Sequence, residues 1–323
     1  MNNKISSISV VVLNYNGLKY LRRTILPLLN LDYPNYEIIV VDNGSTDGSR
    51  EYVAKMPSVN LVISPKEREK NFACNYAIAK TRGDYILLLD NDVIITEKGI
   101  LKNLIKRYLD NKKTGVIGLS LYNYGEIASK SYGNYMGYYY INEQRAIPVK
   151  DLKKHDNSLI AFPEGKALFI KKSIWKKVGG YDDHLKFGGD DSDLGIKLML
   201  MGYKNYLYSS SVQIHIGQPE RDDNKKYALK WKEMFYAHLY TIVKNYRFLN
   251  MIITLIGFSV FGFLKSVKQA IKRRYLRAFL SFFEGYFLFL VNLPVNIKKR
   301  RDMQKKRKIR KDIFLILKLA EFN

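Results

Sequence analysis

The sequence predicts an α/β protein with a mostly parallel sheet, followed by a basic, apolar helical region. Two observations predict the sheet: short β-branched runs alternate with segments of helical period, and the runs show no polar alternation, which is typical of strands buried on both faces. A third, the uneven distribution of charge, predicts the appended region. The strand candidates are residues 8–13, 36–41, 61–63, 85–89 and 116–121.

Helices are expected between these strands. Apolar residues recur at helical spacing in two of the segments, 18–28 and 101–108, so each can cover one face of a sheet. Strands that alternate with helices favour parallel pairing through crossovers. Beyond Gly165, a strand at 167–170 is expected, with helices near 173–178 and 194–201.

Polar side chains follow three of the predicted strands. Asn14 and Asn16 follow the first strand, Asp42 the second, and Asp90 and Asp92 the fourth. Ligands of open α/β sheets bind outside the carboxyl ends of the strands. Any one of these residues could simply end a strand or cap a helix. Three strand ends together favour a ligand crevice.

The segment from Val11 to Gly17, VVLNYNG, followed by 37–49, EIIVVDNGSTDGS, resembles family 2 of the inverting glycosyltransferases, which have the GT-A fold. Leu89-Asp90-Asn91-Asp92 resembles the family's Asp-X-Asp motif. Asp190-Asp191-Ser192-Asp193-Leu194 resembles its Glu-Asp-X-Asp-Leu motif, and His215 follows at the usual distance. The resemblance covers about residues 8 to 217 and is strongest to the rhamnosyltransferase-like branch, whose members end in a basic, membrane-seeking helical region.

The chain departs from the family pattern at three places. Asp190 stands where the family usually has Glu, Lys197 where it often has Arg, and the stretch from Asn71 to Asn75 lacks a glycine common there. The reaction class is therefore better supported than the identity of the substrate.

The resemblance implies a reaction and a set of site residues. A sugar would leave a nucleoside diphosphate, whose growing charge must be met by preorganised positive charge, and Mn²⁺ or Mg²⁺ bound to oxygen ligands supplies it. Inversion by single displacement needs a carboxylate that accepts the proton of the acceptor hydroxyl. The implied catalytic base is Asp191, with Asp190 and Asp193 on the acceptor wall. The implied metal ligands are Asp90, Asp92 and His215, and the implied nucleotide-binding residues are Asn14, Asn16, Asp42, Asn71, Asn75 and Asp90.

Two further groups of residues leave alternatives open. Lys66, Arg68 and Lys70 could contact a diphosphate, although a solvated charged loop is the simpler interpretation. The tyrosine-rich segment 132–140 could form an acceptor-side loop or pack on the sheet edge.

The C-terminal region carries most of the positive charge. Residues 221–323 hold 24 Lys and Arg against 7 Asp and Glu, a net +17 of the +24 in the whole chain. Two apolar stretches, 248–264 and 278–297, are interrupted by polar residues. If both crossed the membrane, the basic segment between them would lie on the outer side, against the tendency of basic residues to stay on the cytoplasmic side. Helices that lie in the interface of an anionic membrane fit the charges better. The continuous run of Phe side chains argues against nucleic acid.

The sequence therefore predicts a catalytic domain over 1–220 and a membrane-associated region over 221–323. We expect a peripheral or monotopic enzyme at the cytoplasmic face of the cell membrane, because one cysteine, Cys74, fits a reducing compartment and no signal peptide is evident. It would transfer a hexose or deoxyhexose from a UDP-, dTDP- or GDP-sugar to a lipid-linked or membrane-proximal glycan. The alternatives are a processive polysaccharide synthase, a nucleotidyltransferase on a similar sheet, and a non-enzymatic membrane adaptor.

Overall fold

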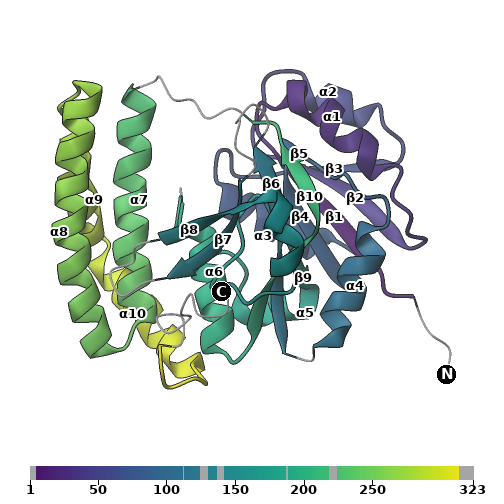
Figure 1. Cartoon of the computed structure of the whole chain (residues 1–323). Coiled ribbons are helices and arrows are strands. Elements are labelled where there is room, and N and C mark those ends of the chain that lie inside the picture. Colours follow the sequence, from purple (N-terminus) through teal and green to yellow (C-terminus); the bar gives the residue numbers. More distant parts are fainter. Residues whose placement is uncertain are drawn as a thin grey trace.

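A computed structural model of the chain describes residues 5–111, 113–123, 130–136, 142–186, 188–217 and 224–312 (Figure 1). Its centre is an eight-stranded sheet with the strand order β3-β2-β1-β4-β9-β6-β10-β5. The pairs of β1 with β2 and β4, of β2 with β3 and of β6 with β10 are parallel, whereas β9 and β5 pair antiparallel to their neighbours. The strands are β1 (Ile8–Asn14), β2 (Tyr36–Asp42), β3 (Val59–Ile63), β4 (Tyr85–Asp90), β5 (Val93–Ile94), β6 (Thr114–Asn123), β9 (Ala167–Lys171) and β10 (Lys204–His215). The predicted mostly parallel sheet and its five N-terminal strands are confirmed.

Helices cover both faces of this sheet, because its strands present apolar side chains to both sides. In β1, Val10 and Val12 belong to one hydrophobic core together with α1 and α4, whereas Val11 and Leu13 belong to a second core with α3 and α6. This alternation is the period-two geometry of a strand buried on both faces. The helices of this part are α1 (Leu18–Leu28), α2 (Ser49–Ala54), α3 (Lys70–Lys80), α4 (Ile100–Asp110), α5 (Lys172–Val178) and α6 (Asp190–Leu200).

Two strands lie outside the main sheet. β7 (Lys130–Met136) and β8 (Asn142–Pro148) form an antiparallel pair, and the 3-10 helix η1 (Val149–His155) follows. Strand β7 holds residues 132–136 of the tyrosine-rich segment, for which the sequence left open an acceptor-side loop or packing on the sheet edge. Residues 137–141 lie outside the described part of the chain.

β10 contains a large bulge. Tyr208 pairs with Leu119 and Gln213 with Leu121, so β10 has four residues where β6 has one. The extra residues are held by hydrogen bonds: Asp156 accepts from the backbone N–H groups of Ser209 and Ser210, and Glu97 accepts from the hydroxyl of Ser211. After the bulge the pairing with β6 resumes as far as His215.

Four helices follow the sheet: α7 (Asn224–Asn245), α8 (Phe248–Arg273), α9 (Arg277–Val291) and α10 (Leu293–Lys306). Figure 1 shows them gathered on one side of the molecule. They are continuous with the second core of the sheet, because Tyr240, Phe282 and Met303 belong to the same buried cluster as Val11 of β1.

The outer side of these helices is apolar and exposed. α8 is long and apolar enough to cross a membrane, with only 22% of its most apolar stretch buried, and α9 with α10 forms a second apolar unit bent by 69°. Exposed large apolar residues of α8 and α9 include Phe248, Leu249, Ile256, Val260, Leu264, Phe283, Phe287 and Leu290. An apolar surface of this extent marks an interaction surface.

Candidate active site

The strand ends meet as the sequence predicted. In the parallel register, Asn14 lies beside Asp42 and Leu13 beside Asp90, so the ends of β1, β2 and β4 form one edge. The side chain of Asn91 donates to the amide oxygen of Asn14 at 2.7 Å, which joins the first and fourth strand ends directly. Gly17 allows this contact, because a Cβ at this position would lie 1.8 Å from the Asn91 side-chain nitrogen and would displace that side chain.

Asp42 is the centre of a buried polar cluster. Its carboxylate accepts hydrogen bonds from the Asn14 amide at 3.2 Å, from the backbone N–H of Ser45 at 3.0 Å and from Arg50 Nε at 2.6 Å. Burial raises the pKa of this group, but the hydrogen bonds from Ser45, Arg50 and Asn14 outweigh it and hold the pKa below its ordinary value. Asp42 is therefore an ionised acceptor at the strand edge.

Asn16 is exposed beside this cluster. Its backbone has a positive φ of 47°, and its side-chain oxygen accepts from the backbone N–H of Thr46 at 2.8 Å. The side chain thus holds the segment after β2 against the segment after β1. Its place at the open edge keeps it available to a nucleotide.

The side chains of Asn71 and Asn75 form hydrogen bonds within the protein. The amide of Asn71 is buried and donates to the carbonyl oxygens of Asp182 and Leu185, at 3.1 and 2.7 Å. Asn75 accepts from the backbone N–H of Tyr181 and donates to its carbonyl oxygen, at 3.1 and 2.9 Å. Both amides hold the segment that leads into α6, and their expected contact with a nucleotide stays a prediction.

Asp92 and His215 are brought together by the sheet. β5 pairs antiparallel with β10 so that His215 lies opposite Val93, the neighbour of Asp92. His215 Nε2 lies 3.1 Å from Asp92 Oδ2, and a Cβ at Gly217 would lie 2.0 Å from the same oxygen. Asp92 Oδ1 is buried and has no hydrogen-bond partner among the described residues. An oxygen atom in this position could coordinate a cation.

Asp90 does not join this pair. Its Oδ1 lies 3.5 Å from Lys70 Nζ, and no group of three or more His, Cys, Asp or Glu side chains within the described ranges has the geometry of a metal site. Burial raises the pKa of Asp90, and the Lys70 ammonium opposes that rise. Asp92 and His215 could still hold Mn²⁺ or Mg²⁺, because these ions commonly take one or two protein ligands together with water and substrate phosphates.

Asp190 and Asp191 begin helix α6 close to the strand ends, because Lys70 Nζ lies 3.5 Å from Asp90 Oδ1 and 3.6 Å from Asp190 Oδ2. We call the region around Lys70, between Asp90 and the start of α6, the cleft. Gly189 precedes them in the left-handed region with a φ of 75°. Asp191 accepts from the backbone N–H of Ser192 at 2.7 Å and from that of Gly165 at 3.3 Å. Gly165 packs so closely that a Cβ on it would lie 3.3 Å from Asp190 Oδ2 and from Asp191 Cβ.

The environment of Asp191 suits a general base. Burial and the neighbouring Asp190 carboxylate raise its pKa from 3.8 to about 7, against the opposing effects of the Ser192 N–H and Lys70. A carboxylate with a pKa near neutrality is matched to proton transfer at physiological pH. Asp191 can therefore accept a proton in the cleft.

Asp193 faces away from the cleft. Its side chain is fully buried and forms ion pairs with Lys197 at 3.1 Å and Lys244 at 2.8 Å. Lys244 also pairs with Asp182 at 2.7 Å, and Asp182 pairs with Lys299 of α10 at 2.9 Å. Asp193 thus anchors α6 to α7 through Lys244, and its expected place on the acceptor wall stays a prediction.

Lys70 lies in the cleft, although the sequence left open whether it contacts a diphosphate or belongs to a solvated loop. Its ammonium lies between Asp90 and Asp190, at 3.5 and 3.6 Å, and donates to the carbonyl oxygen of Gly165 at 3.4 Å. Burial lowers its pKa, but the two carboxylates outweigh that effect and raise it well above the ordinary value. Lys66 and Arg68 point elsewhere, towards Glu69 and the ring of Tyr15. In the sequence, one feature could have distinguished Lys70 from Lys66 and Arg68. Lys70 lies in the first turn of the helix α3, whereas the other two residues precede that helix.

The match to known proteins decides the family. The family model described as glycosyl transferase family 2 matches residues 9–179, more than half of the chain. The chain belongs to glycosyl transferase family 2. Among curated glycosyltransferases, GlyG of Streptococcus pneumoniae is 38% identical over 141 residues, which cover 42% of this chain and 44% of GlyG. The O-antigen chain rhamnosyltransferase WbaN of Salmonella anatum is 22% identical over 59% of this chain and 60% of WbaN. The matched part is thus less than two thirds of either relative.

Two solved structures share the fold of this chain. The mannosyltransferase PcManGT of Pyrobaculum calidifontis, in complex with GDP-Man and Mn²⁺, has a TM-score of 0.52 at 16% identity and covers 97% of this chain and 86% of its own. GalNAc-T7 with UDP, GalNAc and Mn²⁺ has a TM-score of 0.57 at 15% identity, over 75% of this chain and 48% of its own. The fold of this family 2 member is therefore the GT-A fold.

Proposed function

We propose that this family 2 member is an inverting glycosyltransferase that uses a nucleotide-diphosphate sugar as donor and a lipid-linked or membrane-proximal glycan as acceptor. The observation that carries the proposal is the position of Asp191. Asp191 has a pKa raised to about 7, and its neighbour Asp190 lies near the strand-end residue Asp90, because Lys70 Nζ is 3.6 Å from Asp190 Oδ2 and 3.5 Å from Asp90 Oδ1. A proton acceptor therefore lies beside the strand ends at which ligands of such sheets bind. The sugar would be a hexose or deoxyhexose, in keeping with the rhamnosyltransferase named among the relatives.

The donor subsite lies at the ends of β1 and β2. Asp42 Oδ1 accepts from Asn14 at 3.2 Å, and a carboxylate oxygen has more than one lone pair, so the imide N–H of uracil or thymine would donate to the same group. Asn16 lines the same edge. GalNAc-T7 binds UDP and PcManGT binds GDP-Man, so UDP-, dTDP- and GDP-sugars are the donors to compare.

The diphosphate would extend from there towards Asp92 and His215. These two residues would hold Mn²⁺ or Mg²⁺, with phosphate oxygens of the donor completing the shell. When bound, the cation stabilises negative charge on the leaving diphosphate. The orphaned Asp92 Oδ1 supports this assignment, and the Mn²⁺ in two structural neighbours is consistent with it.

The transfer step follows from the position of Asp191. The acceptor hydroxyl attacks the anomeric carbon, the bond from that carbon to the phosphate oxygen breaks, and the electron pair stays on the nucleoside diphosphate. Asp191 takes the proton of the hydroxyl as the new bond forms. Asp190 lies beside it at the start of α6 and would line the acceptor side.

The outer side of α8 and α9 supports the proposal of an acceptor at a membrane. Their exposed apolar residues are flanked by basic residues: Lys268, Lys272, Arg273, Arg274 and Arg277 at one end, and Lys298, Arg301 and Lys305 on α10. Apolar surface with basic flanks suits an interfacial position on an anionic leaflet. We therefore propose a peripheral or monotopic position at the cytoplasmic face of the cell membrane.

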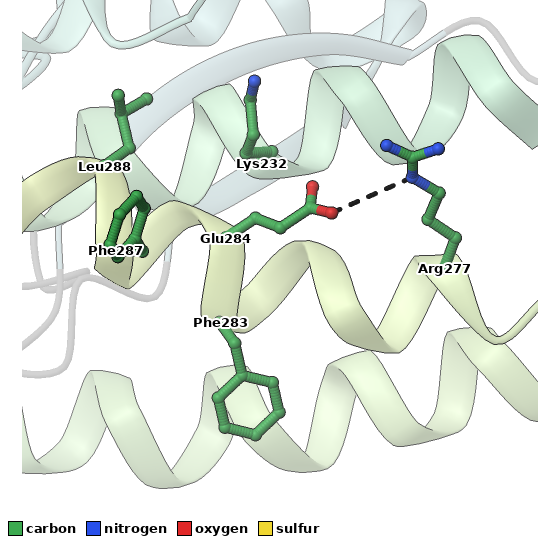
Figure 2. Close-up of a pocket in the computed structure, with 6 residues that line it drawn as sticks. All are labelled: Lys232, Arg277, Phe283, Glu284, Phe287 and Leu288. Carbon is green, nitrogen blue, oxygen red and sulfur yellow. Dashed lines mark ion pairs between the residues drawn. The ribbon is translucent and has the colours of Figure 1, made fainter.

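Glu284 fits such a position. It interrupts the apolar sequence of α9, and Figure 2 shows it directed towards Arg277, whose Nε lies 3.8 Å from its Oε1. The two line a cavity of about 490 Å³ with Lys232, Phe283, Phe287 and Leu288. An exposed ion pair is tolerated at headgroup depth, where water remains available.

The test separates binding from chemistry. Asp191→Asn keeps the shape of the side chain and removes the base, so we expect donor affinity within a few fold of wild type by calorimetry. Transfer should fall by roughly 10² to 10⁴, the usual contribution of general base catalysis. Asp110→Asn, at the exposed end of α4, is the control. Near-normal transfer by Asp191→Asn would reject the base assignment, and no turnover of any UDP-, dTDP- or GDP-sugar by the wild type would reject the donor class.

A further inference from the structure

Lys70 is a cation inside the carboxylate cluster of the cleft. It is the first residue of α3, and about a third of its side chain is exposed, at 31%. Its ammonium lies 3.5 Å from Asp90 Oδ1 and 3.6 Å from Asp190 Oδ2, on opposite walls of the cleft. The proximity of both carboxylates keeps the ammonium charged.

The ammonium is not saturated with hydrogen bonds. It has three N–H groups, and its one hydrogen bond within the described residues goes to the carbonyl oxygen of Gly165 at 3.4 Å. Both carboxylate oxygens lie at ion-pair rather than hydrogen-bond distance, and Asp190 Oδ2 is buried without a hydrogen-bond partner among the described residues. Lys70 therefore balances two negative charges while keeping donors free for a further acceptor.

The same geometry explains why Asp90 stands apart from Asp92 and His215. Asp90 belongs to the motif expected to bind a metal ion, yet the charge that meets it here is Lys70. A divalent cation and Lys70 would compete for that carboxylate. The acceptor that best fits a free ammonium donor at this place is a phosphate oxygen of the donor, because the diphosphate must pass between the strand ends and Asp191.

We propose that Lys70 is a further catalytic residue, whose ammonium donates to the diphosphate of the nucleotide sugar and stabilises the charge on the leaving group. This inference rests on the proposed transferase function. Lys70 keeps its proton throughout: the electron pair of the broken bond goes to the phosphate oxygen, and the acceptor proton goes to Asp191. Before the donor binds, the Lys70 ammonium is paired with the Asp90 carboxylate, and this pairing weakens the affinity of the cleft for a free divalent cation.

The first test compares nucleoside diphosphates with monophosphates. Binding of UDP and UMP, or of the dTDP or GDP pair if the wild type prefers it, is measured by calorimetry in EDTA. In Lys70→Met we expect diphosphate affinity to fall about 10- to 100-fold, the loss of a charge-assisted hydrogen bond, with monophosphate affinity unchanged. Lys70→Arg should retain most of the preference, and Lys80→Met, at the exposed end of the same helix, should retain all of it.

The second test needs no nucleotide. Mn²⁺ binding is followed by electron paramagnetic resonance, and Lys70→Met should bind Mn²⁺ more tightly than wild type because Asp90 is released. Circular dichroism checks that the variants fold. An unchanged diphosphate-to-monophosphate ratio in Lys70→Met, in a wild type that binds the diphosphate, would overturn the Lys70 proposal alone. Failure of the wild type to bind any nucleoside diphosphate would overturn both this proposal and the proposed function.

Discussion

Replacing Asp191 with Asn should stabilise the protein at neutral and alkaline pH. The pKa of Asp191 rises from 3.8 to about 7 because the side chain is largely buried and faces Asp190. Ionising it in the folded state is therefore unfavourable. Between pH 4 and 7 the folded protein holds a proton that the unfolded chain has lost, so this contribution to stability is full below about pH 4 and is lost as the pH rises to 7.

The size of the effect follows from the difference between the two pKa values. About three pH units correspond to about 4 kcal/mol. Solvent reaches part of the side chain, and the Asn variant loses the contact with the Gly165 N–H, so we expect a net gain of about 1–3 kcal/mol above pH 7. For a protein of this size that is roughly 2–8 °C in Tm.

The assay is thermal denaturation of wild type and Asp191→Asn from pH 4 to pH 8.5, in EDTA to keep divalent cations out of the cleft. The two Tm values should nearly coincide at pH 4 and separate progressively up to about pH 7. A gain in Tm of the same size at pH 4 and pH 8 would refute the electrostatic reasoning, as would an Asn variant that is less stable at pH 8.

Four further outcomes are expected. In wild type, kcat/KM should rise about tenfold per pH unit below 7 and level off above it, because only the ionised Asp191 accepts a proton; a flat profile would contradict this. EDTA should abolish transfer, and Asp92→Ala should weaken Mn²⁺ binding measured with donor present; full activity in excess chelator would remove the metal assignment. Lys244→Met should cost about 3–5 kcal/mol of unfolding free energy by leaving two buried carboxylates short of a partner, against no change for exposed Lys225→Met. Ile256→Asp on α8 should reduce co-flotation with anionic vesicles, whereas Leu109→Asp, equally exposed on α4, should not.

The sheet could be predicted from the sequence because each strand corresponds to a short, continuous run of apolar residues. Runs such as 10–13 and 86–89 carry no polar residue on either face, and a strand covered on both sides accommodates that pattern. Parallel pairing then brings Asn14, Asp42 and Asp90 to one edge without further assumption. The Asp92 and His215 pair was expected only through the family resemblance, since the pairing of β5 with β10 joins positions 123 residues apart.

What the sequence could not supply is the direction of individual side chains. Asp191 and Asp193 are two residues apart in one motif, yet the helix turns one towards the cleft and the other towards Lys244. Asn71 and Asn75 occupy a helix next to the site but face the segment 181–185. Lys70 looked like its neighbours Lys66 and Arg68, and only the packing of α3 against Gly165 distinguishes it.

The bulge in β10 makes the site sensitive to chain length rather than to composition. It adds three residues relative to β6, an odd number, so it decides which face of the sheet each later residue presents. Deleting one residue between Ser209 and Val212 would turn the His215 side chain to the opposite face while leaving every side chain of the site chemically intact. Conservative substitutions in this serine stretch should therefore be tolerated, whereas single-residue insertions or deletions there should be lost from any library selected for activity.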